Sequence, residues 1–185
     1  VIMYSIGNEI PEIGSDQGAK IASDICNHIR KIDTTRYTLA SINGIFSAGD
    51  CIPQLVADIC KNTIGDDDLS GNVNNFMALL GQYQDAVVIH PIISKRLEKA
   101  CAATDIAGYN YMTGRYEPDG KTYPNRVIVG SETYPQALAK NWALVKKLPH
   151  LIGDFIWTGW DYIGEAGIGK SIYCQKEEVP QMSRM

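Results

Sequence analysis

The sequence predicts an α/β fold in which parallel strands alternate with helices. Two observations indicate this fold. Short apolar, β-branched runs such as Val127–Gly130 recur along the chain, and segments with helical spacing of apolar residues separate them. Strand–helix–strand order is typical of a parallel sheet or barrel. At 185 residues the chain can form one domain with a sizeable core, but a complete eight-stranded barrel needs roughly 250 residues.

In the first half of the chain, we expect a strand over residues 1–6, a helix over 17–31 and a second strand over 37–42. Ser15 and Asp16 are suited to cap that helix. Residues 43–84 are rich in glycine and carry an acidic run at 66–68, so we interpret them as a long insertion with short helices at 52–59 and 76–80. A long loop at the mouth of a barrel usually shapes the pocket, and we expect this one to influence specificity rather than chemistry.

Regular alternation returns in the second half. The pattern predicts a helix over 92–103, a strand over 105–109, a loop through 118–125, a strand starting at 127, a helix from Pro135 to 147 and a last strand over 151–157. This makes five strands of one type. Because the chain starts inside an apolar strand and lacks an initiator Met, we expect it to be a piece of a longer protein.

Composition excludes several classes of partner. The net charge of -4 provides no basic surface for nucleic acid or anionic lipid, and no apolar run reaches the length of a membrane span. The five cysteines are odd in number and form no CxxC pair, which favours reduced thiols in the cytoplasm over disulfides. No spacing of His, Cys or carboxylates suggests a metal site.

Two carboxylates follow apolar strands and are the candidate chemistry of this chain. Glu9 comes directly after Asn8 at the end of the first strand, and Glu132 comes after Ser131 at the end of the strand that starts at 127. The carboxyl ends of parallel strands meet at one edge, where ligands bind. A pair of carboxylates there is what glycoside hydrolysis requires. The alternative is that each Glu caps a helix or forms a surface ion pair.

Four motifs in the right order carry a resemblance to a known family. They are Asn8-Glu9, the GYNY run at 108–111, the SETYP run at 131–135 and the segment GDFIWTGWDYIGE at 153–165. Together they resemble the strand ends of glycoside hydrolase family 2, with the β-galactosidase branch as the best match. The resemblance implies a (β/α)8 TIM barrel, of which residues 1–169 would form roughly strands 4 to 8 of the catalytic domain. Residues 170–185 do not resemble the family and form a divergent tail.

The same resemblance implies catalytic roles for particular residues. Glu132 would be the nucleophile that attacks the anomeric carbon, and Glu9 the acid that protonates the leaving oxygen and then activates water. The nucleophile needs a hydrogen-bond donor, for which we choose the phenol of Tyr111. Tyr109 is the competing candidate, although strand alternation would place it in the wall.

Substrate contacts follow from the resemblance as well. Asn8 would bind the sugar 2-hydroxyl, Trp157 would present a flat face to the ring, and Asn110 is a weaker polar candidate at the same mouth. The alternative for Trp157 is a buried core indole. No cofactor is required. Some members of the family use magnesium or sodium near the site, but ligands for either are not identifiable in this sequence.

The sequence therefore predicts a retaining β-glycoside hydrolase, a β-galactosidase that cleaves terminal β-galactosides by double displacement. A β-glucuronidase is the runner-up, but it would need cations for the substrate carboxylate, and the segment that follows Trp157, up to residue 170, offers only Lys170. A non-catalytic carbohydrate-binding remnant is the alternative from another class. Expected partners are a carbohydrate substrate and the N-terminal domains and barrel strands missing from this chain, with a homo-oligomer left open.

Overall fold

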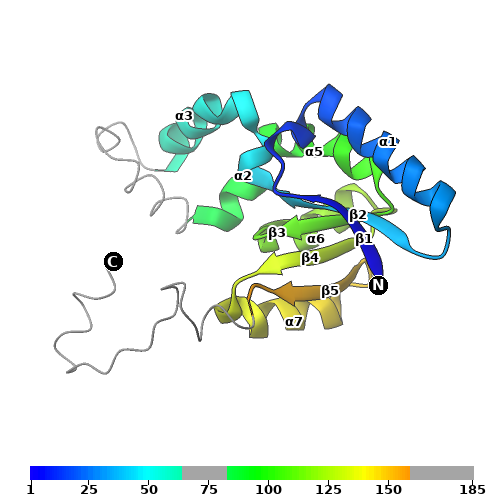
Figure 1. Cartoon of the computed structure of the whole chain (residues 1–185). Coiled ribbons are helices and arrows are strands. Elements are labelled where there is room, and N and C mark those ends of the chain that lie inside the picture. Colours follow the sequence, from blue (N-terminus) through cyan, green and yellow to red (C-terminus); the bar gives the residue numbers. More distant parts are fainter. Residues whose placement is uncertain (64–82, 159–185) are drawn as a thin grey trace, which may run out of the picture.

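Five parallel strands form one sheet in the computed structural model, which describes residues 1–63 and 83–158 (Figure 1). Their order in the sheet follows the chain, so each strand pairs with the next one along the sequence. The strands are β1 Met3–Asn8, β2 Tyr37–Asn43, β3 Ile106–Asn110, β4 Ile128–Thr133 and β5 Leu151–Ile156. All five lie within two residues of their predicted starts.

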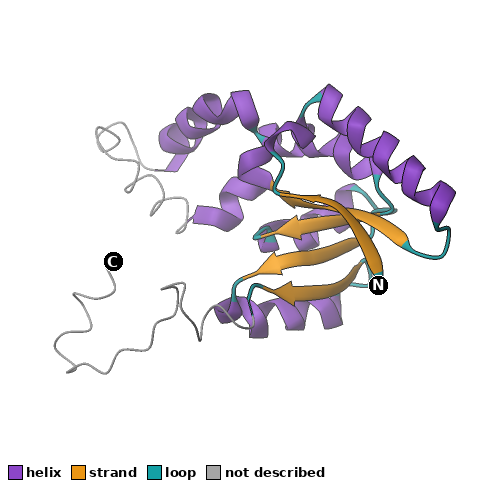
Figure 2. Ribbon diagram, in the orientation of Figure 1, coloured by secondary structure: helices purple, strands orange, loops and turns teal. Residues whose placement is uncertain are grey.

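Helices connect the strands, as the alternating pattern predicts (Figure 2). The α-helices are α1 Asp16–Ile32, α2 Gly44–Ser47, α3 Ile52–Thr63, α5 Pro91–Ala103, α6 Tyr116–Thr122 and α7 Leu138–Lys147, and residues 83–88 are also helical. Short 3-10 turns η1 Pro11–Gly14, η2 Gly49–Cys51, η3 Thr113–Arg115 and η4 Pro135–Ala137 precede or join them. Ser15 caps α1, since its Oγ accepts the Gly18 N–H at 3.0 Å.

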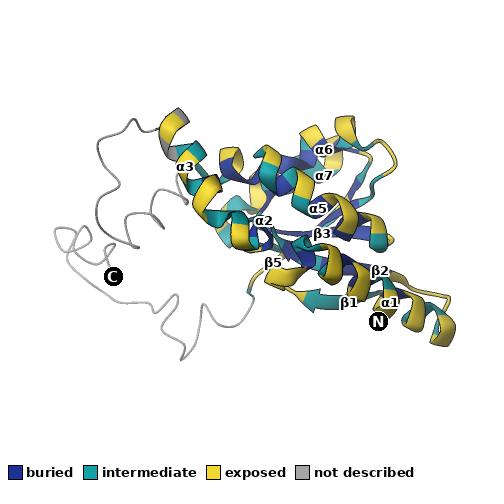
Figure 3. Cartoon of the chain, turned by 90° about the horizontal axis from the view of Figure 1, so that it is seen from above, coloured by how far each residue is buried: buried dark blue, intermediate teal, exposed yellow. Residues whose placement is uncertain are grey.

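The two faces of the sheet are covered differently. Along β2 and β3 the side chains alternate between faces. The main core packs strand residues against α5 and comprises, among others, Ala40, Ile42, Ala107, Tyr109, Ile128, Ile93 and Leu97. On the other face a smaller cluster joins Leu39, Ile106 and Val129, with Met3 and Val127 against it. Figure 3 shows the buried positions gathered where helices meet the sheet.

The expectation of a loop through 118–125 was wrong in part, because helix α6 covers the first part of that range. Pro118 and Gly120 are usually turn signals. Pro118, however, is the third residue of α6, where the backbone N–H would have no partner within the helix. An ion pair between Arg115 and Asp119 further holds this helix in place.

A closed barrel is not confirmed. In the part of the chain that the structure describes, the sheet has five strands, and β1 and β5 are its outer strands. The predicted helix at 52–59 is confirmed as part of α3. The predicted helix at 76–80, the end of the GDFIWTGWDYIGE segment after residue 158 and the tail at 170–185, which starts with Lys170, lie outside the described residues.

Candidate active site

The predicted site residues gather at the carboxyl ends of the strands. Asn8 and Asn110 are the last residues of β1 and β3, Glu132 is next to last in β4, and Trp157 follows β5. The arrowheads in Figure 1 point to one edge of the sheet, so these positions share that edge. Parallel topology with sequential strand order is what brings distant parts of the chain together here.

One amide links the two carboxylates. The Asn110 Nδ2 lies 3.3 Å from Glu9 Oε1 and 3.3 Å from Glu132 Oε2, and 2.9 Å from Asn8 Oδ1. The two carboxylate oxygens are therefore no further apart than twice 3.3 Å. Ser131 Oγ donates to Asn110 Oδ1 at 2.7 Å, which orients the amide so that its N–H groups face the carboxylates. Asn110 itself is fully buried.

Glu132 accepts a hydrogen bond from the Tyr111 phenol at 2.5 Å. The Tyr111 ring stacks on Tyr134 with centroids 4.3 Å apart, which holds the phenol in place. Burial and, after it, the hydrogen bond to Glu132 raise the pKa of Tyr111 well above its usual range, so the phenol keeps its proton and donates. Tyr109 lies elsewhere: it is buried on the helix-covered side of the sheet and donates to Asp119 at 2.5 Å.

Glu9 accepts a hydrogen bond from a residue that sequence analysis missed. Asn43 Nδ2 donates to Glu9 Oε1 at 3.0 Å. Its Oδ1 accepts the backbone N–H of Ile45 at 3.1 Å and caps α2, so the amide is fixed at both ends. A polar residue at the end of the strand at 37–42 was the available signal, but Asn43 was assigned to the insertion instead.

The backbone turns sharply at two site residues. Glu9 has φ 51° and Tyr111 has φ 56°, both in the left-handed region that favours glycine. Each residue follows a strand directly, and each keeps a sheet-like hydrogen bond, from Glu9 N–H to Ser41 O and from Tyr111 N–H to Glu132 O, both at 2.8 Å. The strained turns carry these side chains toward the shared edge.

Trp157 lies at the same end of the sheet. Its backbone N–H donates to Thr133 O at 2.9 Å, and 51% of its surface is exposed. Within the described residues the indole is therefore not part of the buried core. The peptide bond from Trp157 to Thr158 is cis. The role of this side chain toward a sugar stays a prediction.

Neither a metal cluster nor a membrane helix is found in the described ranges 1–63 and 83–158. No group of three or more His, Cys, Asp or Glu side chains there could hold a metal ion. None of the helices in those ranges is long and apolar enough to cross a membrane. Cys26, Cys51 and Cys101 are free thiols.

The parallel α/β sheet and its paired carboxylates define a site of the kind that glycoside hydrolases use. Solved structures of glycosyl hydrolase family 2 members resemble this chain. A member from Bacteroides cellulosilyticus DSM 14838 is 28% identical, with a TM-score of 0.55, over 85% of this chain and 15% of its own length. A second structure of a member from Bacteroides cellulosilyticus gives 28% identity and a TM-score of 0.55, over 85% of this chain and 14% of its own.

The resemblance to glycoside hydrolase family 2 that the four motifs predicted is thereby confirmed. The chain spans only 14–15% of the length of these neighbours, so it corresponds to a small part of each. No protein-family model matches the sequence, and no curated protein matches it.

Proposed function

We propose that the protein is a retaining β-glycoside hydrolase and that this chain supplies both of its catalytic carboxylates. The observation that carries the proposal is the Asn110 amide, which contacts an oxygen of Glu9 and an oxygen of Glu132 at 3.3 Å each. Retaining enzymes hold the two carboxyl groups about 5 Å apart, whereas inverting enzymes leave roughly 6.5–9.5 Å for a water molecule. A shared amide supports the closer arrangement.

In the proposed mechanism Glu132 attacks the anomeric carbon while Glu9 gives its proton to the leaving oxygen. This step breaks the glycosidic bond and forms a glycosyl ester on Glu132. Glu9, now a carboxylate, takes a proton from water, and the resulting hydroxide displaces Glu132 from the anomeric carbon. Tyr111 and Asn110 bind opposite oxygens of Glu132 and so direct the attacking one.

The substrate-binding roles remain part of the proposal. Asn8 is exposed at the end of β1 and is bonded to Asn110, which supports a contact to the sugar 2-hydroxyl beside the nucleophile. Trp157 would present its half-exposed ring to the sugar. Double displacement needs no cofactor.

The barrel and the substrate class rest on the family resemblance. Sequential parallel strands agree with strands 4 to 8 of a (β/α)8 barrel. The motifs favour a β-galactoside over a β-glucuronide, whose carboxylate would require cationic partners. A carbohydrate-binding remnant would need neither glutamate, and the close placement of both argues against it. Free thiols favour a reducing compartment, so a cytoplasmic location belongs to the proposal.

The test is the stereochemistry and the substrate range of the full-length protein. We expect it to hydrolyse p-nitrophenyl β-galactoside faster than the matching β-glucuronide, and proton NMR should show the β-anomer of galactose first. An α-anomer appearing first would contradict the retaining mechanism. Preference for the glucuronide would transfer the proposal to the runner-up activity. Galactose binding without turnover of either substrate would favour the binding remnant.

A further inference from the structure

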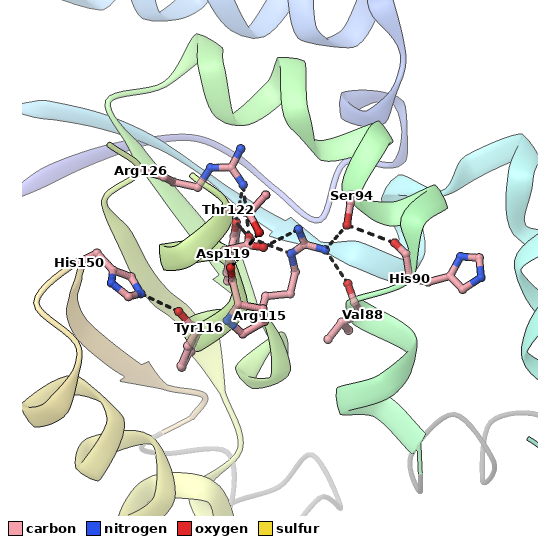
Figure 4. Close-up of polar contacts among 11 residues, drawn as sticks. Val88, His90, Ser94, Arg115, Tyr116, Asp119, Thr122, Arg126 and His150 are labelled. Atoms are coloured by element: carbon pink, nitrogen blue, oxygen red, sulfur yellow. Dashed lines mark hydrogen bonds and ion pairs between the residues drawn. The ribbon is translucent and has the colours of Figure 1, made fainter. Parts of the chain in front are cut away.

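Figure 4 shows a buried ion pair between Arg115 and Asp119. The pair lies on the helix-covered side of β3, because Asp119 bonds to Tyr109, which packs in the main core. Arg115 ends η3 and Asp119 lies in α6, and they are 2% and 4% exposed. Arg115 Nη2 donates to Asp119 Oδ1 at 2.8 Å, and Arg115 Nε donates to Asp119 Oδ2 at 3.0 Å. This bidentate geometry fixes the distance and the orientation of both side chains.

The same carboxylate holds the strand that carries the site. Asp119 Oδ2 accepts the Tyr109 phenol at 2.5 Å, and Arg126 Nη1 lies 3.3 Å away. Tyr109 comes directly before Asn110 and Tyr111, whereas Arg115 follows them. Both ends of the segment 109–115 are thus tied to Asp119, and the two residues that contact the catalytic carboxylates lie between the ties.

Arg115 also binds the helical stretch at residues 83–88 and the start of α5. Its Nη1 donates to Val88 O at 2.8 Å and to Ser94 Oγ at 3.0 Å. At the other end of the same helical stretch, Gln84 Nε2 donates to Tyr111 O at 2.7 Å. The stretch therefore braces the segment 109–115 at both Tyr111 and Arg115.

The ion pair makes no contact with Glu9 or Glu132, so it cannot take part in the chemistry directly. Burying two charges is costly, and a buried ion pair can often be replaced by packed apolar side chains without loss of stability. The presence of this ion pair is therefore better explained by the way it fixes the segment 109–115 than by a gain in stability. Tyr111 depends on such a constraint, because its φ of 56° is disfavoured for a tyrosine.

We propose that Arg115 and Asp119 are positioning residues, which hold the segment 109–115 so that Tyr111 and Asn110 meet Glu132 and Glu9. The assignment rests on the proposed glycosidase function for its effect on turnover. A misplacement of 1 Å at a reacting group costs about 100-fold in rate. Loss of the pair should therefore lower kcat by a factor of that order and change KM much less.

The test is the double variant Arg115→Met/Asp119→Leu in the full-length protein. Replacing both residues removes the two most deeply buried charges together, whereas a single substitution would leave one of them without its main partner. Arg126 loses its contact with Asp119 but keeps its hydrogen bond to the Tyr109 phenol at 3.2 Å and its place over the Tyr123 ring. We expect kcat to fall about 100-fold, KM to change less than about threefold and the melting temperature to stay close to that of the wild type. Tyr109→Phe removes the phenol bond to Asp119 and the bond that the phenol accepts from Arg126, and leaves the Arg115–Asp119 pair in place, so it should give a smaller loss of kcat.

The matched control is Glu117→Leu/Lys121→Met. Glu117 and Lys121 form an ion pair of the same spacing on the exposed side of the same helix, 3.5 Å apart. Removing it should leave kcat unchanged. An unchanged kcat in the Arg115/Asp119 variant would overturn the proposal. So would a loss of activity that only matches a loss of folded protein, because the pair would then be merely structural.

A crystal structure of the double variant separates this proposal from the proposed function. The distance from Tyr111 Oη to Glu132 Oε1, 2.5 Å here, should lengthen beyond hydrogen-bond range. An unchanged distance would overturn the positioning role whatever the wild type hydrolyses. If the wild type hydrolyses no glycoside but the distance lengthens, the proposed function fails and the positioning role stands.

Discussion

The two carboxylates of the site share the Asn110 amide at 3.3 Å but differ in their shorter hydrogen bond. Glu132 lies on β4, between β3 and β5, and accepts a phenol at 2.5 Å. Glu9 follows β1, an outer strand, and accepts amide N–H groups from Asn43 at 3.0 Å and Asn110 at 3.3 Å. In the proposed mechanism one carboxylate must point steadily at carbon, and the other must lose and regain a proton. The carboxylate that must attack carbon, Glu132, thus has the shorter and more rigid hydrogen bond.

The largest effect should come from removing the proposed nucleophile, Glu132. Glu132→Gln keeps the size of the side chain but cannot form the glycosyl ester, so kcat should fall about 10⁴-fold or more. Steady-state hydrolysis of an aryl β-galactoside measures it. Glu98→Gln, the same change at an exposed position of α5, is the control and should keep full activity. Comparable rates for the two variants would show that Glu132 is not the nucleophile.

Removing the other carboxylate should give an effect that depends on the leaving group. Glu9→Ala deletes the proton donor, so hydrolysis of substrates with poor leaving groups should fall about 10³-fold. A dinitrophenyl leaving group needs no proton, and its departure should be slowed far less. Comparing kcat on both substrates makes the measurement. Equal losses would count against the assignment of Glu9 as the acid.

Tyr111→Phe tests the strong tie to the nucleophile. The variant keeps the ring that stacks on Tyr134 and loses the donor to Glu132, and we expect kcat to fall about 100-fold. Tyr4→Phe is a matched control, since Tyr4 also donates its phenol to a carboxylate, Asp33 at 3.0 Å, away from the site. If Tyr4→Phe lost as much activity as Tyr111→Phe, the loss could not be assigned to the hydrogen bond between Tyr111 and Glu132.

Asn43→Ser tests the weaker tie to Glu9. Serine can still cap α2 but is too short to reach the carboxylate, so kcat/KM should fall about tenfold, less than for Tyr111→Phe. Asn43→Ala removes the cap as well and should lower the free energy of unfolding by about 1 kcal/mol. Denaturant unfolding separates the two effects. A drop in activity for the alanine variant alone would mean that Asn43 acts only as a cap.

The smallest effect concerns pH and the Tyr111 phenol. Burial and the bond to Glu132 raise the pKa of Tyr111, so the folded protein holds this proton more tightly than the unfolded chain. The resulting stabilisation is complete below pH ~10, the pKa of an unfolded tyrosine, and is lost as pH rises toward the folded pKa. Urea unfolding at increasing pH should show a shallower decline for Tyr111→Phe than for the wild type. Parallel declines would contradict a tightly held proton.

The strand and helix pattern of this fold could be predicted because it is local. Apolar runs such as that at 127–130 and the cap at Ser15 need no information from elsewhere in the chain. The place of the site could also be predicted, since the carboxyl ends of parallel strands lie on the same side of the sheet. Helix α6 could not be predicted, because Arg115, which pairs with Asp119 of this helix, is itself held by Val88 O and Ser94 Oγ, more than 20 residues away in the sequence.

Which side chains of the site contact one another depends on the register between neighbouring strands, and the sequence of one strand does not reveal that register. Between β3 and β4 the pairing shifts, so that Tyr109 lies opposite Gly130 but Asn110 lies opposite Glu132. That irregularity brings the Asn110 amide to Glu132, the proposed nucleophile. Asn43 was missed for a related reason: only the neighbouring strand shows that its side chain reaches Glu9. The roles of individual residues came from the family resemblance instead.

The left-handed backbone at Glu9 and Tyr111 has a consequence for how this protein can change. Glycine would relieve about 1 kcal/mol at either position, so selection for a robust fold and selection for the site act in opposite directions there. At position 111 glycine would also lose the stacking on Tyr134 and the bond to Glu132. A screen that rewards thermal tolerance alone should therefore recover glycine at position 9 and lose the site with it. The residue at position 9 would then show whether a variant had been selected for catalytic activity or for thermal stability.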